Sequence, residues 1–215
     1  MSKTATGFYS SEQHARGMAQ DNVRMEHTVD ARAQLADCPI IAAVNTVDMI
    51  ETALDSPARS IYLIAGNPLN LPDILKRTRE RGKTCLVNID FLDGLARDRY
   101  AVEWLAQNGA DGIVSTRIEP LKAAHQLKLI TVQRTFAIDS AAVSATIRSL
   151  GQFLPDAMEI LPAIAAPRVA RRIHASFPDI AIIGGGLIES VREIEDLLKA
   201  NIRSVSVSDS RLWLI

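Results

Sequence analysis

The chain has 215 residues, of which 47% are hydrophobic, a length and composition that suit a single domain with a large core. Lys and Arg together number 24 and Asp and Glu 25, so the net charge of −1 excludes binding to nucleic acid by overall charge alone. No apolar run is long enough to span a membrane, and the start Met-Ser-Lys-Thr lacks the apolar segment of a signal peptide. Cys38 and Cys85 have no metal-site spacing. We therefore expect a cytoplasmic protein with reduced thiols, no metal, no cofactor and no membrane partner.

Residues 1–38 differ from the rest of the chain in polarity and periodicity. They are polar and lack sustained periodicity, which predicts a partly disordered extension with a short helix at 30–36. Residues 39–215 are predicted to form one domain.

Short apolar and β-branched runs recur along this domain at intervals of roughly 20–27 residues, the length of a β-loop-α-loop unit. They predict strands at 40–44, 60–65, 84–89, 112–115, 129–133, 157–161, 180–183 and 204–207. The stretches between them look helical. Helical ranges are predicted at 46–54, 71–80, 99–107, 140–150, 167–176 and 190–199, with a short final helix starting at Ser210.

The regular alternation of strand and helix predicts the fold class. Strands that alternate with helices of this length form a parallel sheet. Eight units favour closure into an α/β (β/α)8 TIM-type barrel, in places with shortened helices. The open doubly wound alternative usually has a glycine-rich turn after its first strand, whereas here Val44 is followed by Asn45 and Thr46.

Polar residues and glycines end nearly every predicted strand. In a barrel of this type, these carboxyl ends face the functional site. Alternation in strand 84–89 puts Asn88 and Asp90 on the same face, and in strand 204–207 it turns the serines toward the lumen. A lumen with carboxylate, amide and hydroxyl groups suggests a polyol-like ligand. The candidate polyol-binding residues are Asn45, Asp90, Thr116, Gln133 and Glu159.

The triple glycine Gly184, Gly185 and Gly186 is the strongest single motif. Glycine allows close backbone approach and positive φ, and a helix expected to start near Ser190 would point its N–H groups at the same place. Phosphate commonly binds in this fold at the loops after strands seven and eight. We therefore predict a phosphate site at the three glycines with Ser206 and Ser208, against the alternative of a tight structural turn.

Asp90 and Glu159 are expected on opposite sides of the lumen. Two carboxylates can form a general acid and base pair, but they can equally accept hydrogen bonds from ligand hydroxyls or pair with Arg117 or Arg134. No histidine or lysine lies at a strand end, which disfavours a histidine base, a metal cluster or a Schiff base. We accordingly assign no catalytic residue.

Two groups of arginines are candidates for contact with RNA phosphates. Arg77, Arg79 and Arg81, followed by Lys83, cluster at the end of helix 71–80. Arg168, Arg171 and Arg172 share one face of helix 167–176. A solvated helix surface explains either group equally simply, and the low aromatic content of 5% offers no platform for stacking bases.

These residues resemble the glycerol uptake operon antiterminator family, the glycerol-3-phosphate-responsive RNA-binding regulators. The resemblance runs from Pro39 to about Trp213. It is carried by the segments 39–44 (PIIAAV), 87–90 (VNID), 93–95 (DGL), 109–116 (GADGIVST), 131–134 (TVQR), 138–140 (IDS), 155–162 (PDAMEILP), 184–188 (GGGLI), 206–208 (SVS) and 212–213 (LW).

The resemblance implies a barrel that senses glycerol 3-phosphate and a loaded form that binds a leader mRNA and prevents termination. It places the phosphate on Gly185, Gly186, Ser206 and Ser208. This sequence departs from the family pattern at three positions. Asn45 stands where lysine is usual, Asn88 where histidine is usual, and Arg117 where lysine is usual.

Three functions remain open at this stage. The leading one is the ligand-responsive regulator without catalysis, for which a homo-oligomer would concentrate the arginine faces. The second is a phosphosugar isomerase or aldolase that uses Asp90 and Glu159. The third is a barrel that has kept the ligand site and lost RNA binding.

Overall fold

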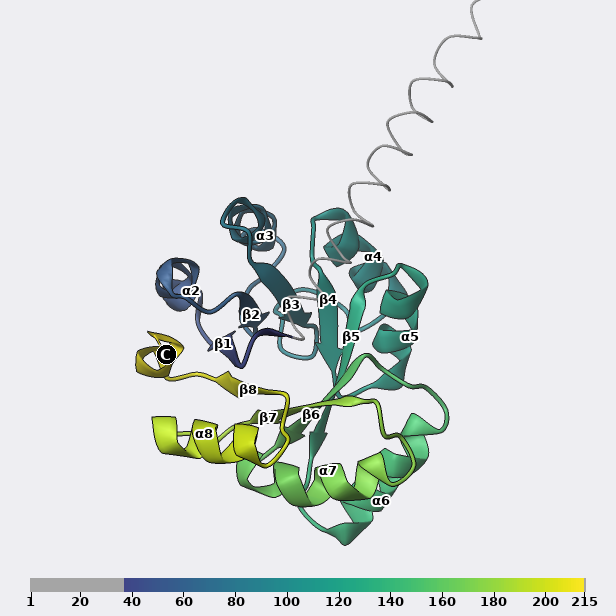
Figure 1. Ribbon diagram of the computed structural model, residues 1–215. Helices are drawn as coiled ribbons and strands as arrows, with labels where there is room; N and C mark the ends of the chain where they lie inside the picture. Colours follow the sequence, from purple (N-terminus) through teal and green to yellow (C-terminus); the bar gives the residue numbers. More distant parts are fainter. Residues whose placement is uncertain (1–36, 215) are drawn as a thin grey trace, which may run out of the picture.

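The computed structural model describes residues 37–214, so the helix expected at 30–36 and nearly all of the extension lie outside the described residues. The described part is a closed barrel of eight parallel strands in sequence order, with the helices around it (Figure 1). Strand β1 pairs with β8, with Ile40 opposite Val205, and this pairing closes the barrel. The predicted (β/α)8 barrel is therefore confirmed.

The strands follow the predicted ranges closely, apart from their ends. They are β1 (Ile40–Val44), β2 (Ser60–Leu63), β3 (Thr84–Asn88), β4 (Gly112–Ser115), β5 (Ile130–Phe136), β6 (Ala157–Leu161), β7 (Ala181–Gly185) and β8 (Ser204–Val207). Strand β5 extends three residues beyond its predicted end, because Arg134, Thr135 and Phe136 stay in register with β6.

The helices cover the outside of the barrel. They are η1 (Val47–Met49), α2 (Ile50–Asp55), α3 (Leu71–Glu80), α4 (Arg99–Gln107), α5 (Ile118–Gln126), α6 (Ser140–Leu150), η2 (Ala163–Ala165), α7 (Ala166–His174), α8 (Val191–Lys199) and η3 (Ser210–Leu214). The expected shortening is seen in α2, which has six residues. The sequence pattern did not predict helix α5. The final helix predicted from Ser210 is the 3-10 helix η3.

Side-chain caps fix where several helices begin. The Asp98 carboxylate accepts hydrogen bonds from the first-turn N–H groups of α4, and Asp139 does the same for Ala142 in α6. Ser190 caps α8 at Glu193, as the capping-box spacing predicts. These caps define where the loops after β3, β5 and β7 end and the following helices begin.

The core has two layers, one between the strands and the helices and one inside the barrel. The inner layer is apolar and includes Ile41, Tyr62, Leu86, Val132 and Ile183. Because successive strand residues point to opposite faces, the polar side chains further along the same strands lie above this apolar floor. The inner layer therefore seals the barrel and leaves the carboxyl ends of the strands for a site.

The outer layer includes Cys85 and the C-terminal residues Leu212 and Trp213. Cys38 and Cys85 are buried, and the Cys38 thiol donates to the backbone oxygen of Ile40. Trp213 is fully buried, and its indole N–H donates to the Val207 carbonyl at 2.7 Å. No helix between residues 37 and 214 has the length and apolar character needed to cross a membrane.

Candidate functional site

Four strands bring a buried polar cluster together above the apolar floor of the barrel. Glu159 on β6 is opposite Arg134 on β5, and Gly185 on β7 is opposite Ser206 on β8. One carboxylate oxygen of Glu159 lies 3.1 Å from Arg134 Nε. The other accepts a hydrogen bond from the Ser206 hydroxyl at 2.5 Å. The register of neighbouring strands thus joins an acid, a base and a hydroxyl in one network.

The electrostatics of this cluster are set by its burial. The Glu159 side chain is only 1% exposed. This burial raises the pKa of Glu159, and the Arg134 charge and the Ser206 hydrogen bond offset the shift only partly. The Arg134 guanidinium lies over the rings of Phe91 and Phe136, at 5.7 and 6.0 Å from their centroids. The cation therefore sits between a carboxylate and two aromatic faces.

The glycine turn packs directly against this cluster. A Cβ added to Gly185 would lie 2.5 Å from Ser206 Oγ and 2.6 Å from Glu159 Oε1, so only glycine fits there. Gly186 has a φ of +75°, which favours glycine, and its carbonyl accepts a hydrogen bond from Ala163 N at 3.2 Å. The structure thus brings Gly185 and Ser206 together, as the order of strands predicted.

Two members of the predicted phosphate site lie elsewhere. A Cβ on Gly184 would point at Ala163 and Ala166, so Gly184 faces the helices and its lack of a side chain serves packing. Ser208 follows the end of β8 and is exposed to solvent. Of the predicted phosphate-site residues, Gly185, Gly186 and Ser206 therefore lie together.

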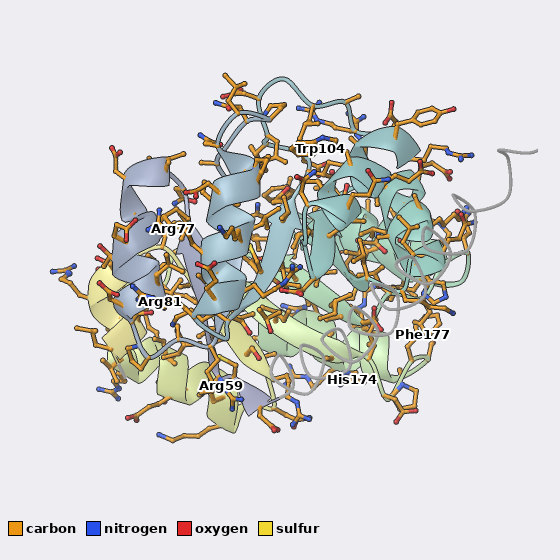
Figure 2. The ribbon with its side chains drawn as sticks, turned by 90° about the horizontal axis from the view of Figure 1, so that it is seen from above. Arg59, Arg77, Arg81, Trp104, His174 and Phe177 are labelled. Atoms are coloured by element: carbon orange, nitrogen blue, oxygen red, sulfur yellow. The ribbon has the colours of Figure 1, made fainter. Side chains whose placement is uncertain are left out.

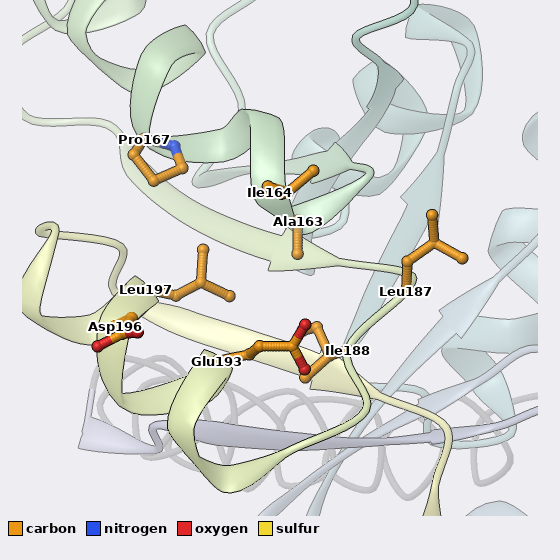
Figure 3. A pocket seen from close by; sticks show the side chains of 8 residues that line it. All are labelled: Ala163, Ile164, Pro167, Leu187, Ile188, Glu193, Asp196 and Leu197. Atoms are coloured by element: carbon orange, nitrogen blue, oxygen red, sulfur yellow. The ribbon is translucent and has the colours of Figure 1, made fainter.

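Two backbone N–H groups at the start of α8 are already occupied by its capping box. The Ser190 hydroxyl accepts from Glu193 N, and the Glu193 carboxylate accepts from Glu189 N at 2.9 Å. Glu193 and Asp196 also line a groove between η2, α7 and α8, on the outer side of the glycine turn (Figure 3). Since two carboxylates face this groove, it disfavours phosphate.

Asp90 connects the end of β3 to the end of β4 through hydrogen bonds. Its carboxylate accepts hydrogen bonds from the Ser115 hydroxyl at 2.9 Å, from Thr116 N at 2.7 Å and from the Thr116 hydroxyl at 2.8 Å. Two predicted polyol-binding residues, Asp90 and Thr116, therefore bond to each other. Asn45, the third, is exposed just after β1. Arg117 is also exposed, and its backbone N–H donates to Ser115 Oγ.

Gln133 was predicted on the wrong face. Its amide donates to the Ser149 hydroxyl of α6 at 2.9 Å, so the side chain points outward from β5. Ile130 and Val132 belong to the inner layer, and the alternation of the strand then turns Arg134 inward instead. The inward position at this level of β5 thus carries a cation and not an amide.

Tyr62 is a candidate site residue that sequence reasoning missed. It lies in the inner layer with 1% exposure, and its hydroxyl has no hydrogen-bond partner among the described residues. Burial, followed by the Glu159 charge, raises its pKa well above the usual value. The Nδ2 atom of Asn88 is likewise buried without a described partner. The alternation Ser60, Tyr62, Ile64 along β2 was the signal that could have placed Tyr62 inside.

The first arginine group is occupied by contacts within the fold. Arg77 pairs with Glu51 and Asp73, and Arg81 pairs with Asp55 at 2.6 Å (Figure 2 labels the two arginines). Arg79 donates to the Gly109 carbonyl. Lys83, which follows them, is buried with its ammonium on two backbone carbonyls. These side chains hold α3 to its neighbours, so the group is not a free cationic surface.

The second arginine group, on α7, is different. Arg168, Arg171 and Arg172 are exposed, and within residues 37–214 none of them forms an ion pair. Arg172 donates to the Ser144 hydroxyl of α6 at 3.1 Å. Over the same range, the structure has no group of three or more side chains suited to hold a metal ion.

Comparison with known proteins decides the family. A family profile described as "Glycerol-3-phosphate responsive antiterminator" matches residues 40–213, which is nearly the whole barrel. The chain belongs to this antiterminator family. The family inferred from the sequence is therefore confirmed.

Solved structures agree with this membership. A glycerol uptake operon antiterminator-related protein from Thermotoga maritima is 32% identical and superposes with a TM-score of 0.75, over 83% of this chain and 99% of that one. A glycerol uptake operon antiterminator regulatory protein from Listeria monocytogenes is 29% identical, also with a TM-score of 0.75, over 81% and 94%. An uncharacterised Escherichia coli protein, YgcP, is 28% identical over 82% of this chain and 92% of its own length.

More distant barrels share the fold of the antiterminator family. A deoxyribose phosphate aldolase from Aeropyrum pernix has a TM-score of 0.63 at 13% identity, over 89% of this chain and 95% of that one. At this identity the likeness concerns the fold alone.

Proposed function

We propose that this protein binds glycerol 3-phosphate at the mouth of its barrel and, when loaded, binds a leader transcript and prevents transcription termination. Family membership supports this reading. The structural observation that carries it is the contact of the Gly185 backbone with Ser206 beside the Arg134–Glu159 pair. This is the level of the barrel at which phosphate commonly binds in the fold.

The phosphate would rest on the Gly185–Gly186 backbone and on Ser206 and Ser208. The Glu159 carboxylate lies directly under the turn and would repel a bound anion, and Arg134, which pairs with this carboxylate, would offset the repulsion. An arginine is well suited to this role because its forked donors match phosphate oxygens.

The glycerol hydroxyls would meet polar groups of the inner wall. Buried polar atoms without partners cost free energy, and proteins keep them where a ligand or water satisfies them. The Tyr62 hydroxyl and Asn88 Nδ2 are two such atoms. Asp90, Thr116 and Glu159 complete the proposed polyol side, with Asn45 at the rim.

We assign the protein no catalytic step. Asp90 is engaged with Ser115 and Thr116, while Glu159 is engaged with Arg134 and Ser206, so each carboxylate has its own separate partners. This arrangement supports ligand binding over a shared acid and base pair. Detection of product from phosphosugars, abolished by Asp90→Asn or Glu159→Gln, would overturn the regulator proposal.

Two measurements test the proposal. Thermal unfolding with glycerol 3-phosphate should show stabilisation that equal concentrations of glycerol or inorganic phosphate do not produce. Transcription in vitro through a terminator-containing leader should read through more often with protein and ligand together than with either alone, as thermodynamic linkage requires. A selective ligand shift without readthrough would mean that the sensor has lost its RNA output.

A further inference from the structure

A groove runs between α6 and α7, separate from the barrel mouth. One wall carries Asp139 and Ser140 at the start of α6, and the other carries Arg168 and Arg172 of α7. Ala137 and Ala165 also line it, and they follow β5 and β6, so the groove opens at the same end of the barrel as the ligand site.

The charge of the groove is positive. Arg168 and Arg172 are spaced i and i+4, so their side chains leave the same helix face about 6 Å apart along its axis. Among residues 37–214 neither has an acidic partner, in contrast to the paired arginines of α3. The acidic neighbour Asp139 is occupied as a helix cap, where it accepts from Ala142 N at 2.8 Å. Two cations therefore remain available to an anionic partner.

We propose that this groove binds the phosphodiester backbone of RNA; the inference rests on the proposed antitermination function. Arginine forks match phosphate oxygens bidentately, and two of them at one-turn spacing can hold successive phosphates. Because the whole chain has a net charge of −1, attraction to RNA has to come from a local surface of this kind.

The groove is also joined to the ligand site by the backbone. The Gly186 carbonyl in the glycine turn accepts from Ala163 N, the first residue of η2. The turn η2 runs directly into α7, which carries Arg168 and Arg172 two and six residues further on. A ligand that reorders the glycine turn thereby acts on the wall of the groove.

The test uses matched arginine pairs and a labelled leader RNA that contains the terminator of the regulated genes. Affinity is measured with glycerol 3-phosphate present at several salt concentrations. The test variant is Arg168→Gln with Arg172→Gln. The control is Arg59→Gln with Arg203→Gln, which removes the same charge from exposed positions just before β2 and β8, at the opposite end of the barrel (Figure 2 labels Arg59).

Each lost phosphate contact should reduce the slope of log affinity against log salt concentration by about 0.7, so the test variant should lose about 1.4 of that slope. At 0.1 M salt, this loss corresponds to about 25-fold weaker binding. The control should bind like the wild type, and both variants should melt like it because all four side chains are exposed. Unchanged affinity of the test variant, or equal loss in the control, refutes the groove. Absence of binding by the wild type instead refutes the antitermination proposal itself.

Discussion

Arg134 and Glu159 occupy partnered positions on β5 and β6, and their side chains meet inside the barrel with 3.1 Å between Nε and Oε2. The two partners are buried unequally, with 12% exposure for the arginine and 1% for the glutamate. The carboxylate therefore depends on the arginine more than the arginine depends on it.

Removing the cation alone should be costly. Arg134→Met leaves the buried Glu159 carboxylate without a counter-charge, so the free energy of unfolding at pH 7 should fall by about 3–5 kcal/mol in urea denaturation. Adding Glu159→Gln to the same chain should recover most of that loss. A double variant as unstable as the single one would show that the two side chains are not coupled.

The stability of the protein should depend on pH through Glu159. Burial raises the pKa of Glu159, so the folded state keeps a proton that the unfolded state has already released. Stability from this group is therefore complete below the ordinary glutamate pKa and is lost as pH rises through the folded-state pKa. Glu159→Gln should remove that decline, which urea titrations between pH 4 and 8 would show. Curves that stay parallel for the two proteins would contradict this assignment.

Gly185 should tolerate no side chain. Its Cβ would collide with Ser206 Oγ and Glu159 Oε1, so Gly185→Ala should cost about 1–3 kcal/mol and abolish the shift with glycerol 3-phosphate. Gly151→Ala is the matched control, because the added Cβ would lie 3.4 Å from the Arg148 carbonyl oxygen and the φ of Gly151 is −68°. That variant should stay within about 0.5 kcal/mol of the wild type. Equal effects at both positions would argue against a close-packed turn.

Tyr62→Phe should separate a ligand role from a structural one. The Tyr62 hydroxyl is buried without a described partner, so removing it should stabilise the ligand-free protein by about 1 kcal/mol. The same change should reduce the thermal shift with glycerol 3-phosphate. Tyr100→Phe, at a position 68% exposed on α4, should alter neither quantity. A stabilised variant that keeps its full ligand shift would remove Tyr62 from the proposed site.

The barrel and the meeting of the glycine turn with Ser206 could be predicted because both depend on strand order. Sequential strands of such a barrel are neighbours, so the ends of β7 and β8 had to lie side by side. The face of Gln133 could not be predicted in the same way. Along β5, Thr131, Gln133 and Thr135 share the outward face, while Ile130 and Val132 precede Arg134 on the inward face, so the expectation that polar strand-end side chains face the lumen selected the wrong phase.

Which arginines form ion pairs could not be predicted from the sequence either. Arg77 and Arg81 pair with Glu51 and Asp55, which belong to a different helix, and only the packing of α2 against α3 brings these groups together. Arg168 and Arg172 look similar in sequence but meet no acid in the described part of the barrel. Whether a basic run is available to a partner is thus a property of the neighbouring elements.

Both cysteines of the chain are buried, with 4% exposure for Cys38 just before β1 and 1% for Cys85 in the outer layer, and burial raises the pKa of the Cys85 thiol. An alkylating reagent in solution should therefore react with them only when the structure around them opens. The rate of alkylation would then measure the rate of that opening. The folded barrel should therefore react little with maleimide dyes. A single cysteine introduced at the exposed Leu187 could then carry a fluorophore that reports the arrival of ligand at the neighbouring turn.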